Sequence, residues 1–135
     1  MPTVTSEWKK AGKEVRVRVR NFEVVIDHPA EQRGTDLGPT PSELLLSSLV
    51  GCYSGTIQAI ARAMSIPVES VRIEAKGEKG EKEYESLKSI SLKVDIQPKV
   101  ESPERLRLLL EQTKRNCTVS NTLTHPPAIS IEPVD

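Results

Sequence analysis

The sequence has very little of several residue types that define particular protein classes. Aromatic residues make up only 3% of its 135 residues, and there are two cysteines. So few cysteines exclude a disulfide-dense secreted scaffold. Lysine plus arginine equals aspartate plus glutamate at 19 each, so the formal net charge is zero. A dedicated nucleic-acid binder normally has a basic excess and stacking aromatics, and this class is therefore disfavoured.

The N-terminal residues lack the apolar stretch of a signal peptide, which predicts a cytoplasmic protein. Residues 44–61 contain no charge, and this run needs a membrane check. A membrane span requires about 20 predominantly apolar residues. Serine, threonine, glutamine and glycine interrupt this run, and Glu43 and Arg62 bound it. We interpret it as a helix buried in protein, and we expect no membrane association.

The length and the 36% apolar content are those of one globular domain. No repeat, low-complexity tract or linker divides the chain, so we expect a single domain over residues 1–135. The densest run of charges, residues 74–85, is expected to form a solvated hairpin and loop.

Alternation of apolar and polar residues predicts the strands. Residues 14–20 read Glu-Val-Arg-Val-Arg-Val-Arg, and residues 22–26 continue as a second apolar strand. Residues 27–40 hold two glycines and two prolines and are expected to form a long loop. Further strands are expected over residues 71–75, 90–96 and 128–131.

Two N-terminal signatures predict the helices. Thr40-Pro41-Ser42-Glu43 combines a capping threonine, a first-turn proline and a glutamate three residues after the cap, and predicts a helix to about Met64. Ser102-Pro103 opens a second helix with a stripe of leucines, and residues 116–123 are expected to form one or two helical turns. Strands, a long helix, strands, a helix and a strand make an α+β fold.

The long helix has more apolar surface than one small sheet can cover. Small residues recur every four positions along one stripe, at Ser47, Gly51, Gly55 and Ala59. Such a stripe allows another helix to approach closely. We therefore predict an obligate homodimer with these helices in its core, and burial inside a monomer is the alternative.

Few side chains could carry chemistry. His28 and His125 combine with the two cysteines at no recurrent metal-ligand spacing, so no metal site is expected. Cys52 lies in the middle of the predicted helix, where the helix dipole gives a thiolate little help, so a low pKa there would need a cation from elsewhere. Cys117 follows two basic residues, and local charge favours it as the more acidic thiol.

Two motifs resemble those of a known family. Residues 38–46 (Gly-Pro-Thr-Pro-Ser-Glu-Leu-Leu-Leu) and 49–52 (Leu-Val-Gly-Cys) resemble the first-cysteine helix of the OsmC/Ohr family, the osmotically inducible protein C-like and organic hydroperoxide resistance proteins. Residues 116–123 (Asn-Cys-Thr-Val-Ser-Asn-Thr-Leu) resemble its second motif, usually Cys-Pro-Val-Ser-Asn. The 65-residue separation of Cys52 and Cys117 also fits, and the resemblance covers essentially the whole chain.

The resemblance implies strands packed around a long, central, buried helix in an intertwined homodimer, with each site built from both chains. It implies a thiol-dependent peroxidase that reduces organic hydroperoxides, and hydrogen peroxide less well, in oxidative stress defence. Cys52 takes the peroxidatic role and Cys117 the resolving role. An external dithiol, lipoyl-type for some relatives, resets the pair, and no metal or bound cofactor is implied.

The chain departs from the family pattern in its polar residues. The arginine that holds the thiolate in well-characterised members has no counterpart in the matching turn, which contains lysines. Glu43 is the candidate catalytic carboxylate, nine residues before Cys52 as in the YhfA-like branch rather than ten, although the capping box already explains it. These departures leave open a non-enzymatic redox-sensing or small-ligand-binding dimer. The candidate cations for Cys52 are Lys10, Lys13, Arg16, Arg18, Arg20 and Arg33.

Overall fold

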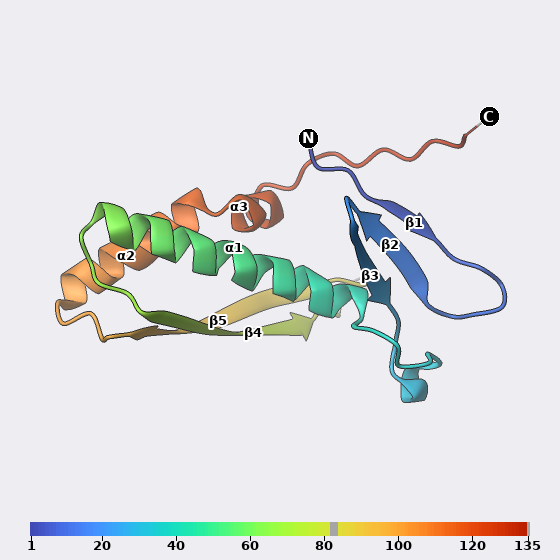
Figure 1. Cartoon of the computed structure of the whole chain (residues 1–135), viewed down its shortest axis with the longest axis horizontal. Helices are drawn as coiled ribbons and strands as arrows, with labels where there is room; N and C mark the ends of the chain where they lie inside the picture. The colour runs from blue at the N-terminus through green and yellow to red at the C-terminus, as the bar shows by residue number, and fades with distance from the viewer. Residues whose placement is uncertain (82–83, 135) are drawn as a thin grey trace. The chain divides into compact units, whose positions relative to one another are not determined.

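The computed structural model describes residues 1–81 and 84–134, which fall into two compact units that meet within one long helix (Figure 1). The first unit is Met1–Leu45, and the second begins at Leu46. Strands β1–β3, helix α1, strands β4 and β5, and helices α2 and α3 follow in that order, which confirms the α+β class. The division falls inside α1, so one domain over residues 1–135 stays a prediction. In the expected charged hairpin, Lys82 and Glu83 lie outside the described residues.

The first unit is a three-stranded antiparallel sheet in the order β1-β2-β3. Its strands are β1 (Thr5–Glu7), β2 (Val15–Val19) and β3 (Phe22–Ile26), and the two predicted strands are confirmed. The alternation places the valines of β2 on a half-buried face and its arginines on the exposed face. On that exposed face, the Arg16 guanidinium pairs with the Glu23 carboxylate across the β2–β3 ladder at 2.6 Å.

A buried carboxylate organises the loop between β3 and α1. Asp27 is only 3% exposed. Its oxygens accept hydrogen bonds from the Thr35 hydroxyl and from the main-chain N–H groups of His28, Thr35 and Leu37. These bonds, the Thr35 hydroxyl first among them, hold the pKa of Asp27 well below its usual range. The predicted loop is confirmed, with one 3-10 turn at Ala30–Gln32, and it is built around a single side chain.

Helix α1 (Pro41–Ala63) begins with the predicted capping box. The Glu43 N–H donates to Thr40 Oγ1 at 3.2 Å, and the Thr40 N–H donates to the Glu43 carboxylate at 2.9 Å. Each residue therefore satisfies a main-chain donor that the helix leaves unpaired. The helix ends one residue before the predicted position, and Ser65 then takes a left-handed conformation with a φ of 56°.

The second unit packs two helices against an antiparallel hairpin (Figure 1). Strands β4 (Ser70–Lys79) and β5 (Leu87–Gln97) form the hairpin, and α2 (Pro103–Asn116) and α3 (Thr118–Thr124) follow it. These elements confirm the strands predicted over residues 71–75 and 90–96 and the predicted second helix. Ser102 caps α2 as expected, because its hydroxyl accepts the Arg105 N–H.

The core of this unit is aliphatic, as the shortage of aromatic residues requires. Helix α1 contributes its C-terminal half, β5 one buried isoleucine and α2 the fully buried Leu109. The buried apolar cluster consists of Ile57, Ala61, Ile66, Ile96 and Leu109. This core fixes α1 against α2 and thereby sets the distance between the two cysteine-bearing segments.

The predicted strand at Ala128–Ile131 is wrong for the described chain. Residues 126–134 form no helix or strand and are exposed throughout. Ile129 is 87% exposed and Ile131 is 94% exposed. The alternating pattern is present in the sequence, but a strand needs a neighbouring strand to pair with, and this segment pairs with none within the described chain.

Helix α1 is covered on one side only. Within the chain, its buried residues are Leu49, Ile57 and Ala61. The stripe of small residues faces outward, and a side chain added at Gly51 or Gly55 would meet nothing within 4 Å. By length and composition alone, this helix could also cross a membrane, a test that core helices of soluble proteins meet as well. The described chain therefore leaves an apolar helix surface uncovered, and the homodimer stays a prediction.

Candidate functional site

The fold of the second unit brings the two cysteines together. Cys52 lies half-buried in the middle of α1, and Cys117 lies fully buried between α2 and α3. Each thiol shifts the pKa of the other although 65 residues separate them, so the fold brings the two side chains close together. The two motifs that carried the family resemblance thus meet at their sulfur atoms.

Cys117 holds its place because it ends one helix and begins the next. It is the C-cap of α2 and the N-cap of α3, and its Sγ accepts the Ser120 N–H at 3.4 Å. Sulfur here takes the position that a serine or aspartate oxygen usually occupies at a helix start. The helix starts at Thr118, where the family usually has proline, so the substitution leaves this start intact.

The first turn of α3 supplies the polar contacts of the thiol pair. The first N–H groups of a helix have no partner within the helix. Here the Ser120 N–H donates to Cys117 Sγ at 3.4 Å, and the N–H groups of Thr118 and Val119 lower the pKa of Cys52. The open main-chain donors of this short helix therefore act on both sulfur atoms.

Two further hydrogen bonds link α3 to its neighbours. The hydroxyls of Tyr53 on α1 and Ser120 on α3 lie 3.4 Å apart. The Asn121 side-chain amide donates to the Arg115 carbonyl at the end of α2, at 3.0 Å. Because Tyr53 follows Cys52 directly, the first of these contacts holds α3 beside the cysteine of α1.

Hydrogen bonds make Cys52 the more acidic thiol. Burial raises its pKa, since it disfavours the charged form. Bonds from the Val119 N–H, the Cys117 thiol, the Thr118 N–H and the Thr56 hydroxyl outweigh that effect, and the pKa of Cys52 lies below its ordinary value. Within the described part of the second unit, no lysine or arginine is among these leading contributors. Main-chain, thiol and hydroxyl donors thus lower the pKa of Cys52, an effect that the sequence predicted from a cation.

The pKa of Cys117 is raised instead. Burial is the main cause, and the hydrogen bond and charge of Cys52 act in the same direction. The expectation that local charge makes Cys117 the more acidic thiol is wrong. Lys114 and Arg115 are exposed, and neither is among the main causes of the pKa shift of Cys117. Their closeness in sequence therefore does not make this thiol more acidic.

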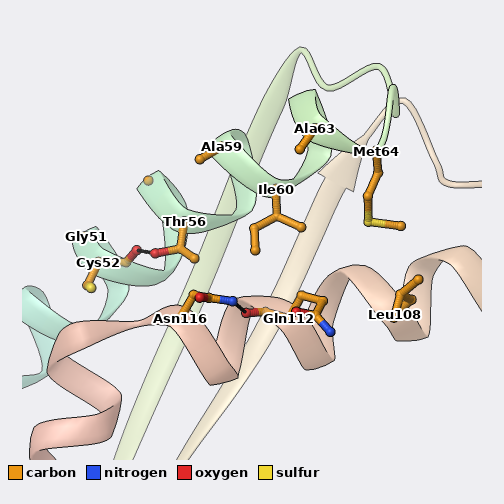
Figure 2. A pocket seen from close by; sticks show the side chains of 11 residues that line it. Gly51, Cys52, Thr56, Ala59, Ile60, Ala63, Met64, Leu108, Gln112 and Asn116 are labelled. Carbon is orange, nitrogen blue, oxygen red and sulfur yellow. Dashed lines mark hydrogen bonds between the residues drawn. The ribbon is translucent and has the colours of Figure 1, made fainter.

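A groove opens beside Cys52 between α1 and α2 (Figure 2). It has a volume of about 770 Å³. Cys52 lies towards one end, while Met64 and Leu108 lie towards the other. The lining is mostly aliphatic, with Gln112 and Asn116 as its amide side chains. An elongated apolar molecule with a reactive polar end fits this distribution, its polar end beside the thiol.

The other predicted site residues belong to the first unit. Glu43 accepts the hydrogen bonds of the capping box, and these bonds lower its pKa. Its structural role is confirmed, and its catalytic role stays a prediction. Of the candidate cations, Arg16 pairs with Glu23 and Glu14, and Arg20 lies over the Phe22 ring at 5.1 Å. The remaining candidates, all in the same unit, are Lys10, Lys13, Arg18 and Arg33.

Sequence reasoning missed the donors around the thiols. Thr56, one helical turn after Cys52, could have been found from its i+4 spacing, which places both side chains on one face. The N–H groups of Thr118 and Val119 carry no sequence signal beyond the helix start itself. Among the described residues, no three His, Cys, Asp or Glu side chains cluster as metal ligands would.

A family model described as OsmC-like protein matches residues 34–132, which is most of the chain and includes both cysteines. The chain belongs to the OsmC-like protein family. This confirms the resemblance of the two motifs, whereas the YhfA-like branch stays a prediction. No curated protein matches the sequence significantly.

Solved structures of OsmC-like proteins have the same fold. An OsmC-like protein from Mycoplasma pneumoniae is similar with a TM-score of 0.81 at 21% identity, over 93% of this chain and 89% of the other. A second similar structure is a putative organic hydroperoxide resistance protein from Vibrio cholerae, with captopril bound in one of its active sites. It has a TM-score of 0.75 at 20% identity, over 93% of this chain and 85% of the other. The organic hydroperoxide resistance protein OhrB of Bacillus subtilis has a TM-score of 0.71 at 16% identity, over 93% of this chain and 92% of the other. At these identities the likeness shows the fold.

Proposed function

We propose that this OsmC-like protein is a thiol-dependent peroxidase that reduces organic hydroperoxides, and hydrogen peroxide less well, in peroxide defence. The observation that carries the proposal is an interacting pair of unequal thiols. Cys52 has the lowered pKa and lines an open groove, whereas Cys117 has the raised pKa and is buried. A peroxidatic thiol needs thiolate character and access, and a resolving thiol needs only to be close.

In the first step, the Cys52 thiolate attacks the terminal oxygen of the hydroperoxide. A sulfur–oxygen bond forms as the O–O bond breaks, Cys52 becomes a sulfenic acid, and the alkoxide leaves with a proton as the alcohol. The aliphatic lining beside Cys52 favours an alkyl substituent over a small polar peroxide. This selectivity follows from burial of the apolar chain in the groove.

In the second step, the Cys117 sulfur attacks the Cys52 sulfenic acid. A disulfide forms and the sulfenic oxygen leaves as water, which protects Cys52 from further oxidation. An external dithiol, of which lipoyl groups are one type, then reduces the disulfide by two thiol–disulfide exchanges. The dithiol thus supplies the two electrons that the peroxide accepts, and no bound cofactor takes part.

The names of structural neighbours support the same chemistry. The Vibrio cholerae and Bacillus subtilis proteins are both described as organic hydroperoxide resistance proteins. The unequal thiol pair of this chain has the arrangement that such chemistry requires.

Turnover with an alkyl hydroperoxide tests the proposal. We expect sustained consumption of cumene hydroperoxide with dihydrolipoamide as reductant, and none from Cys52→Ser. Cys117→Ser is expected to react once and then to accumulate Cys52 sulfinic acid, measured by mass spectrometry. A single stoichiometric oxidation of the unmodified protein, without turnover, would instead favour the redox-sensing dimer, and no oxidation at Cys52 would refute both.

Glu43 is proposed as a carboxylate of the catalytic machinery in addition to its capping role. Glu43→Gln separates these roles, because an amide oxygen still accepts the Thr40 N–H that the carboxylate now accepts. We expect lower peroxide turnover with an unchanged unfolding temperature. Equal turnover would leave Glu43 as a helix cap only.

We further propose that the protein is a cytoplasmic homodimer whose α1 helices pack on one another. The exposed stripe of small residues and the one-sided burial of α1 support this arrangement. Gly51, Gly55 and Ala59 also line the groove beside Cys52, so in this arrangement the partner's helix would form the outer wall of the groove. The extended C-terminal segment with exposed Ile129 and Ile131 supports pairing with a second copy as well. Sedimentation equilibrium is expected to give twice the chain mass of 14.9 kDa.

A further inference from the structure

Thr56 lies beside the reactive cysteine on the same helix. It lies one turn after Cys52 on α1, is half-buried, and lines the same groove. Its hydroxyl donates to the Cys52 carbonyl oxygen at 2.8 Å (Figure 2). The i+4 spacing places the Thr56 and Cys52 side chains on one face of α1, and the Thr56 hydroxyl lowers the pKa of Cys52.

The hydroxyl has one proton and therefore serves one acceptor at a time. In a helix, the Cys52 carbonyl already accepts the main-chain N–H four residues later, so the hydroxyl bond to that carbonyl is a second one. The thiol is a weak acceptor while it is protonated, but a thiolate accepts a charge-assisted bond that is about twice as strong as a neutral one. The preferred acceptor of Thr56 thus changes when Cys52 ionises.

We propose that Thr56 is a positioning residue that stabilises the Cys52 thiolate by turning its hydroxyl from the Cys52 carbonyl to the Cys52 sulfur. It does so in a site where main-chain N–H groups, rather than a cationic side chain of the second unit, hold the anion. Its catalytic consequence rests on the proposed peroxidase function. Its effect on the ionisation of Cys52 does not.

The surroundings of Cys52 explain why a single hydroxyl, that of Thr56, affects its ionisation. The helix position gives no dipole assistance, and burial opposes the anion. The donors from α3, the Thr118 and Val119 N–H groups, come from a separate element that must stay docked. Thr56 is the donor that belongs to the same helix as the sulfur, so its contact persists when α3 moves.

The ionisation of Cys52 can be measured without peroxide, by following its alkylation with iodoacetamide against pH and resolving the two cysteines by peptide mass spectrometry. Thr56→Val removes the hydroxyl at nearly constant shape, and Thr56→Ser retains it. We expect Thr56→Val to alkylate about tenfold more slowly near neutral pH, with a midpoint about one pH unit higher, because one charge-assisted hydrogen bond is lost. Thr56→Ser is expected to follow the unmodified protein.

The plateau of the alkylation rate at alkaline pH, where Cys52 is fully ionised, distinguishes an effect on ionisation from a change in the structure around the thiol. If Thr56 acts on the thiolate alone, the plateau of Thr56→Val equals that of the unmodified protein. Superimposable midpoints for Thr56→Val and the unmodified protein overturn the inference, as does a midpoint for Thr56→Ser shifted as far as that of Thr56→Val. Thr56→Ala repeats the test if the valine variant fails to show the native circular dichroism spectrum. Failure of peroxide turnover in the unmodified protein leaves these profiles intact, so the two proposals fail separately.

Discussion

Replacing Gly55 with leucine separates the stability of the chain from the stability of a dimer. Gly55 lies on the outward stripe of α1, and an added Cβ would meet nothing within 4 Å in one chain. Glycine inside a helix costs about 1 kcal/mol relative to good helix formers. Gly55→Leu should therefore leave the fold of one chain intact and slightly favour its long helix.

The same substitution is unfavourable where two α1 helices pack through small residues. Inserting a large side chain into a close interface costs about 1–3 kcal/mol. In a two-fold dimer the change occurs twice, which gives roughly 2–6 kcal/mol. At tenfold for each 1.4 kcal/mol, the dimer dissociation constant rises about thirtyfold at the lower end.

Analytical ultracentrifugation over a concentration series measures this effect. Gly55→Ala is the matched control, since it adds only a methyl group at the same position and should remain largely dimeric. Circular dichroism reports in parallel that the helix content of Gly55→Leu is retained. The reasoning is refuted if Gly55→Leu dimerises as tightly as the unmodified protein, or if the unmodified protein is a monomer.

The thiol pair, the core leucine and the buried aspartate each give a further prediction. Iodoacetamide should modify Cys52 before Cys117 at neutral pH, because the pKa of the first thiol is lowered and that of the second is raised; peptide mass spectrometry gives the order, and the reverse order contradicts the assignment of roles. Leu109→Ala should lower the free energy of unfolding by about 2–5 kcal/mol in urea titrations, since Leu109 is fully buried between helices and hairpin. The pKa of Asp27 is lowered in the folded protein, so its contribution to stability is present above the ordinary value of 3.8 and is lost as the pH falls below it; Asp27→Asn should flatten that part of the stability profile, and an unchanged acid limb would contradict this account.

The elements with strong local signals were predictable from the sequence. The capping box at Thr40 and Glu43 fixed the start of α1, because both partners lie within one turn. The valine and arginine alternation gave β2 with correct faces for the same local reason. The approach of Cys52 to Cys117 came from the family resemblance, since no local pattern encodes a contact across 65 residues.

What sequence reasoning missed depends on tertiary contacts. The acidity of Cys52 is set by N–H groups of another helix, and main-chain donors are the same for every residue type. The expected acidity of Cys117 was wrong because burial outweighs nearby charges that stay in solvent. The strand at Ala128–Ile131 was wrong because a period-two pattern shows that a segment is able to pair, whereas pairing itself depends on which strand the fold places beside it.

The capping role of Cys117 links the order of the two chemical steps to the backbone. Its sulfur anchors the first turn of α3, and that turn also holds the Cys52 anion. In the proposed cycle, any shift of Cys117 towards an oxidised Cys52 disturbs this anchorage, but only after the negative charge on Cys52 has been consumed. The contacts of α3 with the two sulfur atoms are thus intact while Cys52 is a thiolate, and they loosen only after Cys52 has been oxidised. In this way the seven-residue helix α3 would set the order of attack and resolution.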